Sequence, residues 1–314
     1  MSIHRQRTEE IDFLKFVFII LMIAFHLVFI GDTYPYAKQF VYTFHMPAFL
    51  VISGFMLNTE KPIGQTLHTM LWIFIPYAVL ECGYTIAASM LPVREHVSEL
   101  TAKLIIENIF IHPLGPYWYL HTLMLCGLTY ALTFHFVKFN RLTMFVLLGI
   151  LYTVYAQYLH IVSLPCAFYF MAGAIVRQSG VGFLSIFRPS FLTIIPIVWL
   201  SFYPENLDRA AVTGVMLVYL IMCFCLSCYP FVRGFLRKTT LFIGRNTLVL
   251  LMFSPLFTVL AKLYQPFLVG IDPSGMVFLV ASLLFAVGGC FALAYVMDRL
   301  RISRFFFGKP RILQ

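Results

Sequence analysis

Three ionisable side chains share one face of an apolar segment near the N-terminus, which reads DFLKFVFIILMIAFH over residues 12–26. All the residues between Lys15 and His26 are apolar. At about 100° per residue, a helix brings His26 to within roughly 20° of Lys15 and to within roughly 40° of Asp12. Because ionisable groups in a membrane span usually face a protein interior or a wet cavity, this alignment predicts a functional stripe.

An imidazole in such a stripe suits acid–base chemistry. Histidine has a reference pKa of about 6.5, so it can accept and return a proton near neutral pH. A base of this kind removes the proton from a hydroxyl group as its oxygen attacks a carbonyl. Asp12 and Lys15 lie within one helical turn, and we expect them to form a pair, since an unpaired charge there would be costly.

The elements that position these groups are predicted to be membrane helices. Hydrophobic residues make up 61% of the 314-residue chain and charged residues 11%, against about 45–50% and about 25% in soluble domains. So little charge excludes a soluble protein of this size and predicts an all-α polytopic membrane protein. The first apolar run has no small-residue cleavage pattern after it, so we expect a retained helix and not a signal peptide.

Breaks at charged, Pro and Gly clusters divide the chain into ten candidate spans, each close to the roughly 20 residues that cross a bilayer. The longest segment outside them, residues 91–115, is expected to carry an amphipathic surface helix in its middle. We predict a single transmembrane domain over residues 1–314, with no fused soluble domain. The predicted spans are residues 11–31, 40–58, 67–90, 116–137, 142–160, 163–177, 190–204, 210–229, 240–264 and 274–297.

The net charge of +9 is explained by topology. With the N-terminus inside, fifteen of the 22 lysine and arginine residues lie in cytoplasmic segments and four in external ones. Basic residues gather on the cytoplasmic side of a membrane, so this distribution predicts an even number of spans and two cytoplasmic termini. It favours membrane lipids, and not nucleic acid, as the surroundings of the basic residues.

The seven cysteines all lie in apolar runs, so we predict no disulfide framework. Three of them form the sequence CFCLSC at residues 223–228. Their spacing, in an apolar helix with no histidine nearby, suits a closed metal site poorly. We expect buried small side chains there and no metal site.

Further polar groups occur at a similar predicted depth on the first four spans, towards the outer surface. Each has a plain structural explanation, since a buried histidine often makes a structural hydrogen bond and Trp118 could anchor the helix at the interface. Their shared depth nevertheless predicts one pocket that opens outward. The residues assigned to it are His26, His45, Glu81, Trp118 and His121.

Five motifs in these helices are together typical of one known family. IDFLK at residues 11–15, followed by His26, is similar to a first helix in which a basic residue precedes a histidine by a fixed interval. FHMPAFLVISGF at 44–55 is similar to the second-helix signature of the same family. YWYLHTL at 117–123, FYFMAGAIV at 168–176 and LFIGRNTLVLLM at 241–252 are similar to three of its later elements. The chain therefore resembles the acyltransferase 3 family of integral-membrane acyltransferases.

The resemblance implies about ten helices in a bacterial inner membrane and an acyl-CoA donor, such as acetyl-CoA, that arrives from the cytoplasm. It implies a sugar hydroxyl of a surface glycan or lipid-linked saccharide as the acceptor, and no bound cofactor. Two departures stand out. Lys15 stands where arginine is commoner in the family. A lysine keeps the positive charge but lacks the planar guanidinium group. TLHTMLWIFIPY at 66–77 offers only His68 where many members have paired arginines.

Acyl transfer gives each candidate a role. His26 is the expected base, either directly or through an acyl-histidine intermediate, and the sequence leaves both routes open. The expected donors to the thioester oxygen, which becomes negative during the reaction, are Ser53, Trp118 and His121. The candidates for binding the phosphates of coenzyme A are Arg177, Arg188, Arg233, Arg237, Lys238 and Arg245. The cytoplasmic bias of basic residues also explains all of these except Arg245, which lies at the start of a span.

A transporter or flippase for a lipid-linked saccharide is the rival prediction, because buried acids, lysines and histidines also form proton relays. We see no paired halves and no matched interrupted helices in the sequence, which argues against it. A non-catalytic scaffold for polysaccharide assembly is a third possibility, and it does not explain the stripe. Release of free coenzyme A in the presence of an acceptor would separate an enzyme from a carrier.

Overall fold

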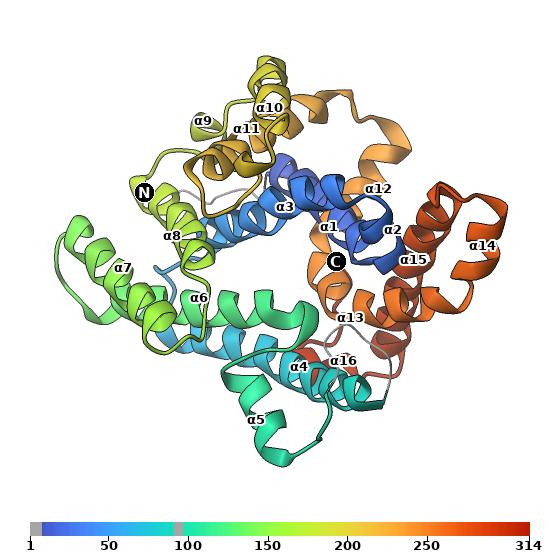
Figure 1. The fold of residues 1–314 in the computed structure, drawn as a ribbon. Helices are drawn as coiled ribbons and strands as arrows, with labels where there is room; N and C mark the ends of the chain where they lie inside the picture. Colours follow the sequence, from blue (N-terminus) through green and yellow to red (C-terminus); the bar gives the residue numbers. More distant parts are fainter. Residues whose placement is uncertain (1–7, 91–96) are drawn as a thin grey trace. The chain divides into compact units, whose positions relative to one another are not determined.

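The fold is described by a computed structural model that covers residues 8–90 and 97–314 (Figure 1). These residues form helices and no strands, which confirms the all-α prediction. Contacts divide the chain into two compact units. The first unit contains the residues up to Phe49, Phe183–Arg299 and Arg311–Gln314, and the second contains Leu50–Gly182 and Leu300–Pro310.

Helix α3 begins in the first unit and ends in the second. The other α-helices of the first unit are α1 (Glu9–His26), α2 (Val28–Thr33), α9 (Phe183–Ile186), α10 (Ile194–Ser201), α11 (Val212–Cys228), α12 (Gly234–Arg245), α13 (Thr247–Leu260), α14 (Gln265–Ile271) and α15 (Met276–Arg299). The second unit contains the end of α3 (Pro35–Met56) and α4 (Ile63–Met90), α5 (Ala102–Phe110), α6 (Trp118–Phe136), α7 (Arg141–Gln157), α8 (Leu164–Ser179) and α16 (Ser303–Phe307).

Several of these helices can cross a membrane by length and composition. Four stretches among the described residues meet both criteria: α3, α4, Val212–Phe231 and α15. The bent pair α12 and α13 makes a fifth if it is counted as one span. Helices also occur within every one of the ten predicted spans. The count of ten and the cytoplasmic location of both termini stay predictions, as does the single-domain assignment.

Two of the predicted spans contain a break, so neither is one continuous helix. The first breaks at Leu27, whose ψ of 106° is extended, so α1 ends at His26. The ninth breaks at Asn246, where α12 and α13 meet at 83°. In both cases a side chain bonds to the carbonyl four residues earlier: His26 to Met22 at 2.7 Å and Asn246 to Phe242 at 2.8 Å. An asparagine that binds nearby backbone in this way competes with helix propagation. The histidine contact alone does not end a helix, because His45 makes the same contact with Val41 inside the unbroken α3.

The amphipathic helix expected between the third and fourth predicted spans is present as α5. Its N-terminus is capped by Thr101, whose hydroxyl oxygen accepts a hydrogen bond from the backbone N–H of Leu104 at 3.1 Å. Ile106 and Phe110 are exposed on it. This pattern fits a helix that lies on a membrane surface. The first part of the predicted segment, residues 91–96, lies outside the described residues.

The glycines of the sequence motifs are packing residues. A Cβ on Gly54 in α3 would collide with the carbonyl oxygen of Phe170 in α8, and a Cβ on Gly173 in α8 would collide with that of Val51. In the first unit, a Cβ on Gly244 would collide with the carbonyl oxygen of Asp12. Glycine therefore lets α8 approach α3 and lets α12 approach α1 without side chains in between.

We expect Gly244→Ala to destabilise the protein by about 1–3 kcal/mol, the usual penalty for overpacking a tight contact. The added methyl group would meet backbone, which cannot rotate away as a flexible side chain can. The midpoint of thermal unfolding in detergent measures the change. Gly288→Ala in α15 is the matched control, because a Cβ there meets open space. Equal midpoints for the two variants would contradict the packing role of Gly244.

Candidate active site

The acid and the base of the sequence stripe form a buried ion pair at the start of α1. The Oδ1 atom of Asp12 lies 2.8 Å from the Nζ atom of Lys15, as the helical spacing predicts. The side chain of Asp12 is 1% exposed and that of Lys15 9%. The Oδ2 atom of Asp12 lies 3.4 Å from the Nε atom of Arg245, at the end of α12. One buried carboxylate thus contacts two cations from different helices.

A second carboxylate extends this cluster towards solvent. Glu9 accepts hydrogen bonds from the hydroxyl of Tyr229 and from the guanidinium of Arg237. These hydrogen bonds hold the pKa of the Glu9 carboxyl below its usual value. An Nη atom of Arg245 lies 4.0 Å from the other oxygen of Glu9. Arg237 is one of the basic residues proposed from the sequence to bind coenzyme A. Glu9 and Tyr229 were not singled out, although Glu9 lies one helical turn before Asp12 and so on the same face.

Two histidines of the first unit are held in the same way. The Nδ1 atom of His26 lies 2.7 Å from the carbonyl oxygen of Met22, and the Nδ1 atom of His45 lies 2.7 Å from that of Val41. A carbonyl oxygen only accepts hydrogen bonds, so each neutral ring carries its hydrogen on Nδ1. The Nε2 atom of each ring is then the basic nitrogen.

One tyrosine lies between these two imidazoles. The ring centre of Tyr42 is 6.0 Å from that of His26 and 5.2 Å from that of His45. Its hydroxyl donates a hydrogen bond to the carbonyl oxygen of Phe25 at 3.2 Å. The Nζ atom of Lys38 lies 6.0 Å from the centre of the same ring. The sequence did not single out Tyr42, although it lies one turn before His45 on α3.

The basic nitrogen of His45 is enclosed. The residue is 2% exposed, and its Nε2 atom has no hydrogen-bond partner among the residues that the structure describes. A buried acceptor without a donor costs about 1–3 kcal/mol. A hydroxyl group placed against this nitrogen would therefore be stabilised. His26 is half-buried and ends its helix, so it is the more accessible of the two.

Two predicted site residues of the second unit hold the segment before α6. The Oε1 atom of the fully buried Glu81 accepts a hydrogen bond from the backbone N–H of Leu114 at 2.6 Å. The Nε2 atom of His121 lies 3.0 Å from the carbonyl oxygen of Phe110, so this nitrogen carries the hydrogen. His121 thus has the opposite tautomer from His26 and His45. Its observed contact positions the backbone.

Two further predicted site residues of the second unit, Ser53 and Trp118, contact Tyr119. The hydroxyl groups of Ser53 and Tyr119 lie 2.8 Å apart. The half-buried Trp118 packs edge-on against the ring of Tyr119, with 6.3 Å between ring centres. Arg177 lies in the last turn of α8, also in the second unit. The predicted pocket draws on both units, so a single site that contains all five of its residues stays a prediction.

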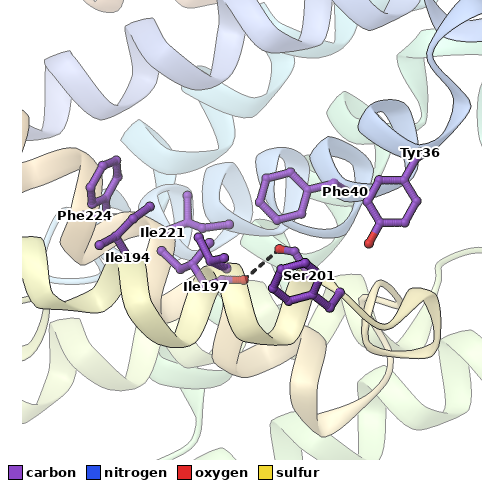
Figure 2. Close-up of a pocket in the computed structure, with 9 residues that line it drawn as sticks. Tyr36, Phe40, Ile194, Ile197, Ser201, Ile221 and Phe224 are labelled. Carbon is purple, nitrogen blue, oxygen red and sulfur yellow. Dashed lines mark hydrogen bonds between the residues drawn. The ribbon is translucent and has the colours of Figure 1, made fainter.

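An apolar groove is a separate feature of the first unit (Figure 2). It has a volume of about 640 Å³ between α3, α10 and α11. The hydroxyl of Ser201 donates to the carbonyl oxygen of Ile197 at 2.7 Å, so the serine presents little polarity to the groove. The groove suits an alkyl chain better than a polar ligand. Its lining consists of Tyr36, Phe40, Ile194, Ile197, Val198, Ser201, Phe202, Ile221 and Phe224.

The cysteine cluster forms no metal site within residues 8–90 and 97–314. The three cysteines of α11 are free thiols: Cys223, Cys225 and Cys228. No group of three or more metal-ligating side chains occurs in that part of the chain. Cys223 is buried, whereas Cys225 and Cys228 are half-buried.

Comparison with known proteins gives one match. Residues 8–295 match the model of the acyltransferase 3 family, whose description is an acyltransferase domain. The matched range begins just before α1 and ends within α15, so it contains every residue that the sequence analysis assigned to the site. No curated protein and no solved structure matched the chain.

Proposed function

The chain belongs to the acyltransferase 3 family, and on that premise we propose that it is a membrane-embedded O-acyltransferase. The proposed reaction moves an acetyl group from acetyl-CoA, on the cytoplasmic side, to a hydroxyl of a surface glycan or lipid-linked saccharide. The proposed location is a bacterial inner membrane. The observation that carries the proposal is the state of His26, whose Nδ1 atom is tied to the Met22 carbonyl and whose Nε2 atom is left basic.

In the direct route, His26 acts as a general base. Its Nε2 atom takes the proton of the acceptor hydroxyl while the hydroxyl oxygen attacks the thioester carbonyl carbon. The new C–O bond forms and the C–S bond breaks. The sulfur of coenzyme A leaves as a thiolate and takes the proton from the imidazolium, which regenerates the neutral base.

In the stepwise route, the Nε2 atom of His26 attacks the thioester first and coenzyme A leaves. The acceptor hydroxyl oxygen then attacks the acyl carbon, the C–N bond to Nε2 breaks, and the acylated sugar leaves. The hydroxyl proton passes to the freed Nε2 and then to solvent, which balances the proton that the coenzyme A thiolate takes up. The Met22 carbonyl serves both routes, because it fixes the ring and its tautomer. A labelled acyl group that stays on the protein when the acceptor is withheld would identify this route.

The other residues take supporting roles in the proposal. Asp12 and Lys15 are proposed to hold the cytoplasmic end of α1 in place. Arg245 is proposed to bind donor phosphates, and Arg177 is a further candidate for that role. Ser53 and Trp118 are the proposed donors to the thioester oxygen. His121 and Glu81 are proposed as positioning residues, because their contacts hold the backbone between α5 and α6.

His45 is proposed to accept a hydrogen bond from the acceptor hydroxyl through its enclosed Nε2 atom. In His45→Asn the side-chain amide can still donate to the Val41 carbonyl, but nothing replaces Nε2. In His45→Gln the longer side chain places an oxygen near the Nε2 position. We expect His45→Asn to lower acyl transfer by roughly tenfold or more, the loss of one buried hydrogen bond, and His45→Gln to recover part of it.

The acyl-transfer rate of each His45 variant is measured as release of coenzyme A from acetyl-CoA. The assays use equal amounts of folded protein and a membrane extract that supplies the acceptor. If both variants transferred acyl groups at the wild-type rate, His45 would have only a packing role. A loss in both variants with a lowered thermal midpoint would assign His45 to folding instead.

A carrier is the second candidate function, because interrupted helices line the binding sites of many transporters. The first unit contains two such breaks, at Leu27 and Asn246. Purified protein in detergent separates the two functions. An acyltransferase releases free coenzyme A from acetyl-CoA when the membrane extract is present, whereas a carrier releases none.

A further inference from the structure

Several hydrogen-bond donors converge on one oxygen atom of Glu9. The hydroxyl of Tyr229 donates to its Oε2 atom, as do the Nε atom of Arg237 at 3.2 Å and one Nη atom of the same guanidinium. Arg237 also lies over the ring of Tyr229, 5.3 Å from its centre. Two guanidinium donors and a phenol directed at one point form an arrangement that binds phosphate groups.

A second guanidinium borders the same carboxylate from α12. An Nη atom of Arg245 lies 4.0 Å from the Oε1 atom of Glu9, while its Nε atom lies 3.4 Å from Asp12. Asp12 therefore contacts the Nε side of the Arg245 guanidinium, and an Nη atom of the same group points towards Glu9. These ion pairs join two carboxylates, Glu9 and Asp12, to three cations. The cations are Lys15, Arg237 and Arg245.

The two carboxylates differ in how easily they can be displaced. The side chain of Asp12 is 1% exposed, and separating a buried ion pair is strongly unfavourable. The side chain of Glu9 is 39% exposed, and those of Arg237 and Arg245 are 49% and 40% exposed. Exposed ion pairs stabilise a protein little. Glu9 can therefore turn away at small cost, and Asp12 cannot.

From these contacts we propose that Glu9 is a resident anion in a phosphate-binding site formed by Arg237, Arg245 and Tyr229. A phosphate group of the acyl-CoA donor displaces the Glu9 carboxylate and accepts the same hydrogen bonds. The inference rests on the proposed function, since it takes acyl-CoA as the donor. In the free protein, Glu9 occupies the phosphate site and so weakens donor binding. When the donor binds, its phosphate group displaces the Glu9 carboxylate.

The proposal predicts that removing the Glu9 charge strengthens donor binding. We expect Glu9→Gln to lower the dissociation constant for coenzyme A roughly two- to fivefold, which corresponds to the strength of an exposed ion pair. Glu9→Asp, which keeps the charge, should show a smaller change. Glu10→Gln is the matched control, because it removes the same charge one position on, about 100° around the helix.

The measurement is a titration of the full chain with coenzyme A, in a detergent free of anionic lipid. S-acetyl-pantetheine, which lacks the phosphates, serves as the comparison ligand and should bind Glu9→Gln and wild type alike. Adding Arg237→Gln to Glu9→Gln should abolish the gain. Equal thermal midpoints for wild type and Glu9→Gln would show that the fold is unchanged.

Three results would overturn the proposal in distinguishable ways. If wild type binds coenzyme A and Glu9→Gln binds it no more tightly, or no more tightly than Glu10→Gln does, Glu9 is not displaced by the donor, and the proposed function stands. If wild type does not bind coenzyme A at all, the donor assignment fails and this inference fails with it. If Glu9→Gln gained no affinity for coenzyme A but bound vesicles of anionic lipid more tightly than wild type does, the site would be assigned to a lipid headgroup and the donor phosphate rejected.

Discussion

His26→Ala is expected to abolish acyl transfer and leave a folded, donor-binding protein. The loss should reach at least the roughly 10²–10⁴-fold that a positioned general base supplies, and more if the acyl group passes through the imidazole. The ring is half-buried at the end of α1, and its hydrogen bond to Met22 is local. Its removal should therefore change the thermal midpoint little. Coenzyme A release at equal membrane protein levels is the readout.

Alanine variants of the other site histidines, His45 and His121, are the controls for this experiment. His45→Ala should impair transfer less than His26→Ala, because His45 is proposed to orient the acceptor hydroxyl and not to take its proton. If His26→Ala turned over near the wild-type rate while His45→Ala or His121→Ala was inactive, the wrong base would have been chosen. The site would then have to be built around the other imidazole.

Lys15→Ala is expected to have the second-largest effect, on both activity and expression. It removes the cation 2.8 Å from a carboxylate that is 1% exposed. Breaking a buried ion pair costs about 3–5 kcal/mol, and the remaining contact of Asp12 with Arg245 should reduce that loss. Expression level, thermal midpoint and coenzyme A release measure the outcome.

Two companion variants test the reason for this effect. Lys15→Arg keeps the charge and should retain much of the activity. Adding Asp12→Asn to Lys15→Ala removes the unpaired carboxylate, so the double variant should express better than Lys15→Ala. Wild-type expression and activity in Lys15→Ala would show that the pair supports neither the fold nor the reaction.

Features that depend on local spacing could be predicted from the sequence. The helical period placed Lys15 one turn after Asp12, and the structure has the two charges in contact. Composition alone indicated an all-α membrane protein, and motif spelling indicated the family. The motif glycines had no assigned role in the sequence, and their packing against backbone became evident only from the structure.

Contacts between distant segments could not be predicted in this way. Arg245 lies 233 positions from Asp12, and Tyr229 lies 220 positions from Glu9. No local period relates such residues, and without the fold a surface arginine looks the same as one that contacts a buried carboxylate. The helix breaks escaped notice for a related reason, because a hydropathy pattern does not reveal that Asn246 bonds to the backbone behind it.

The protein is proposed to acylate a glycan hydroxyl, with His26 carrying out the transfer. The most direct test is the O-acetyl content of surface and lipid-linked glycans from a deletion strain that carries an empty plasmid, the wild-type gene or the His26→Ala variant. We expect an O-acetyl group to be missing in the deletion strain, to return with the wild-type gene and to stay missing with His26→Ala at the same protein level. Identical O-acetyl content in all three strains, or full recovery with His26→Ala, would contradict it.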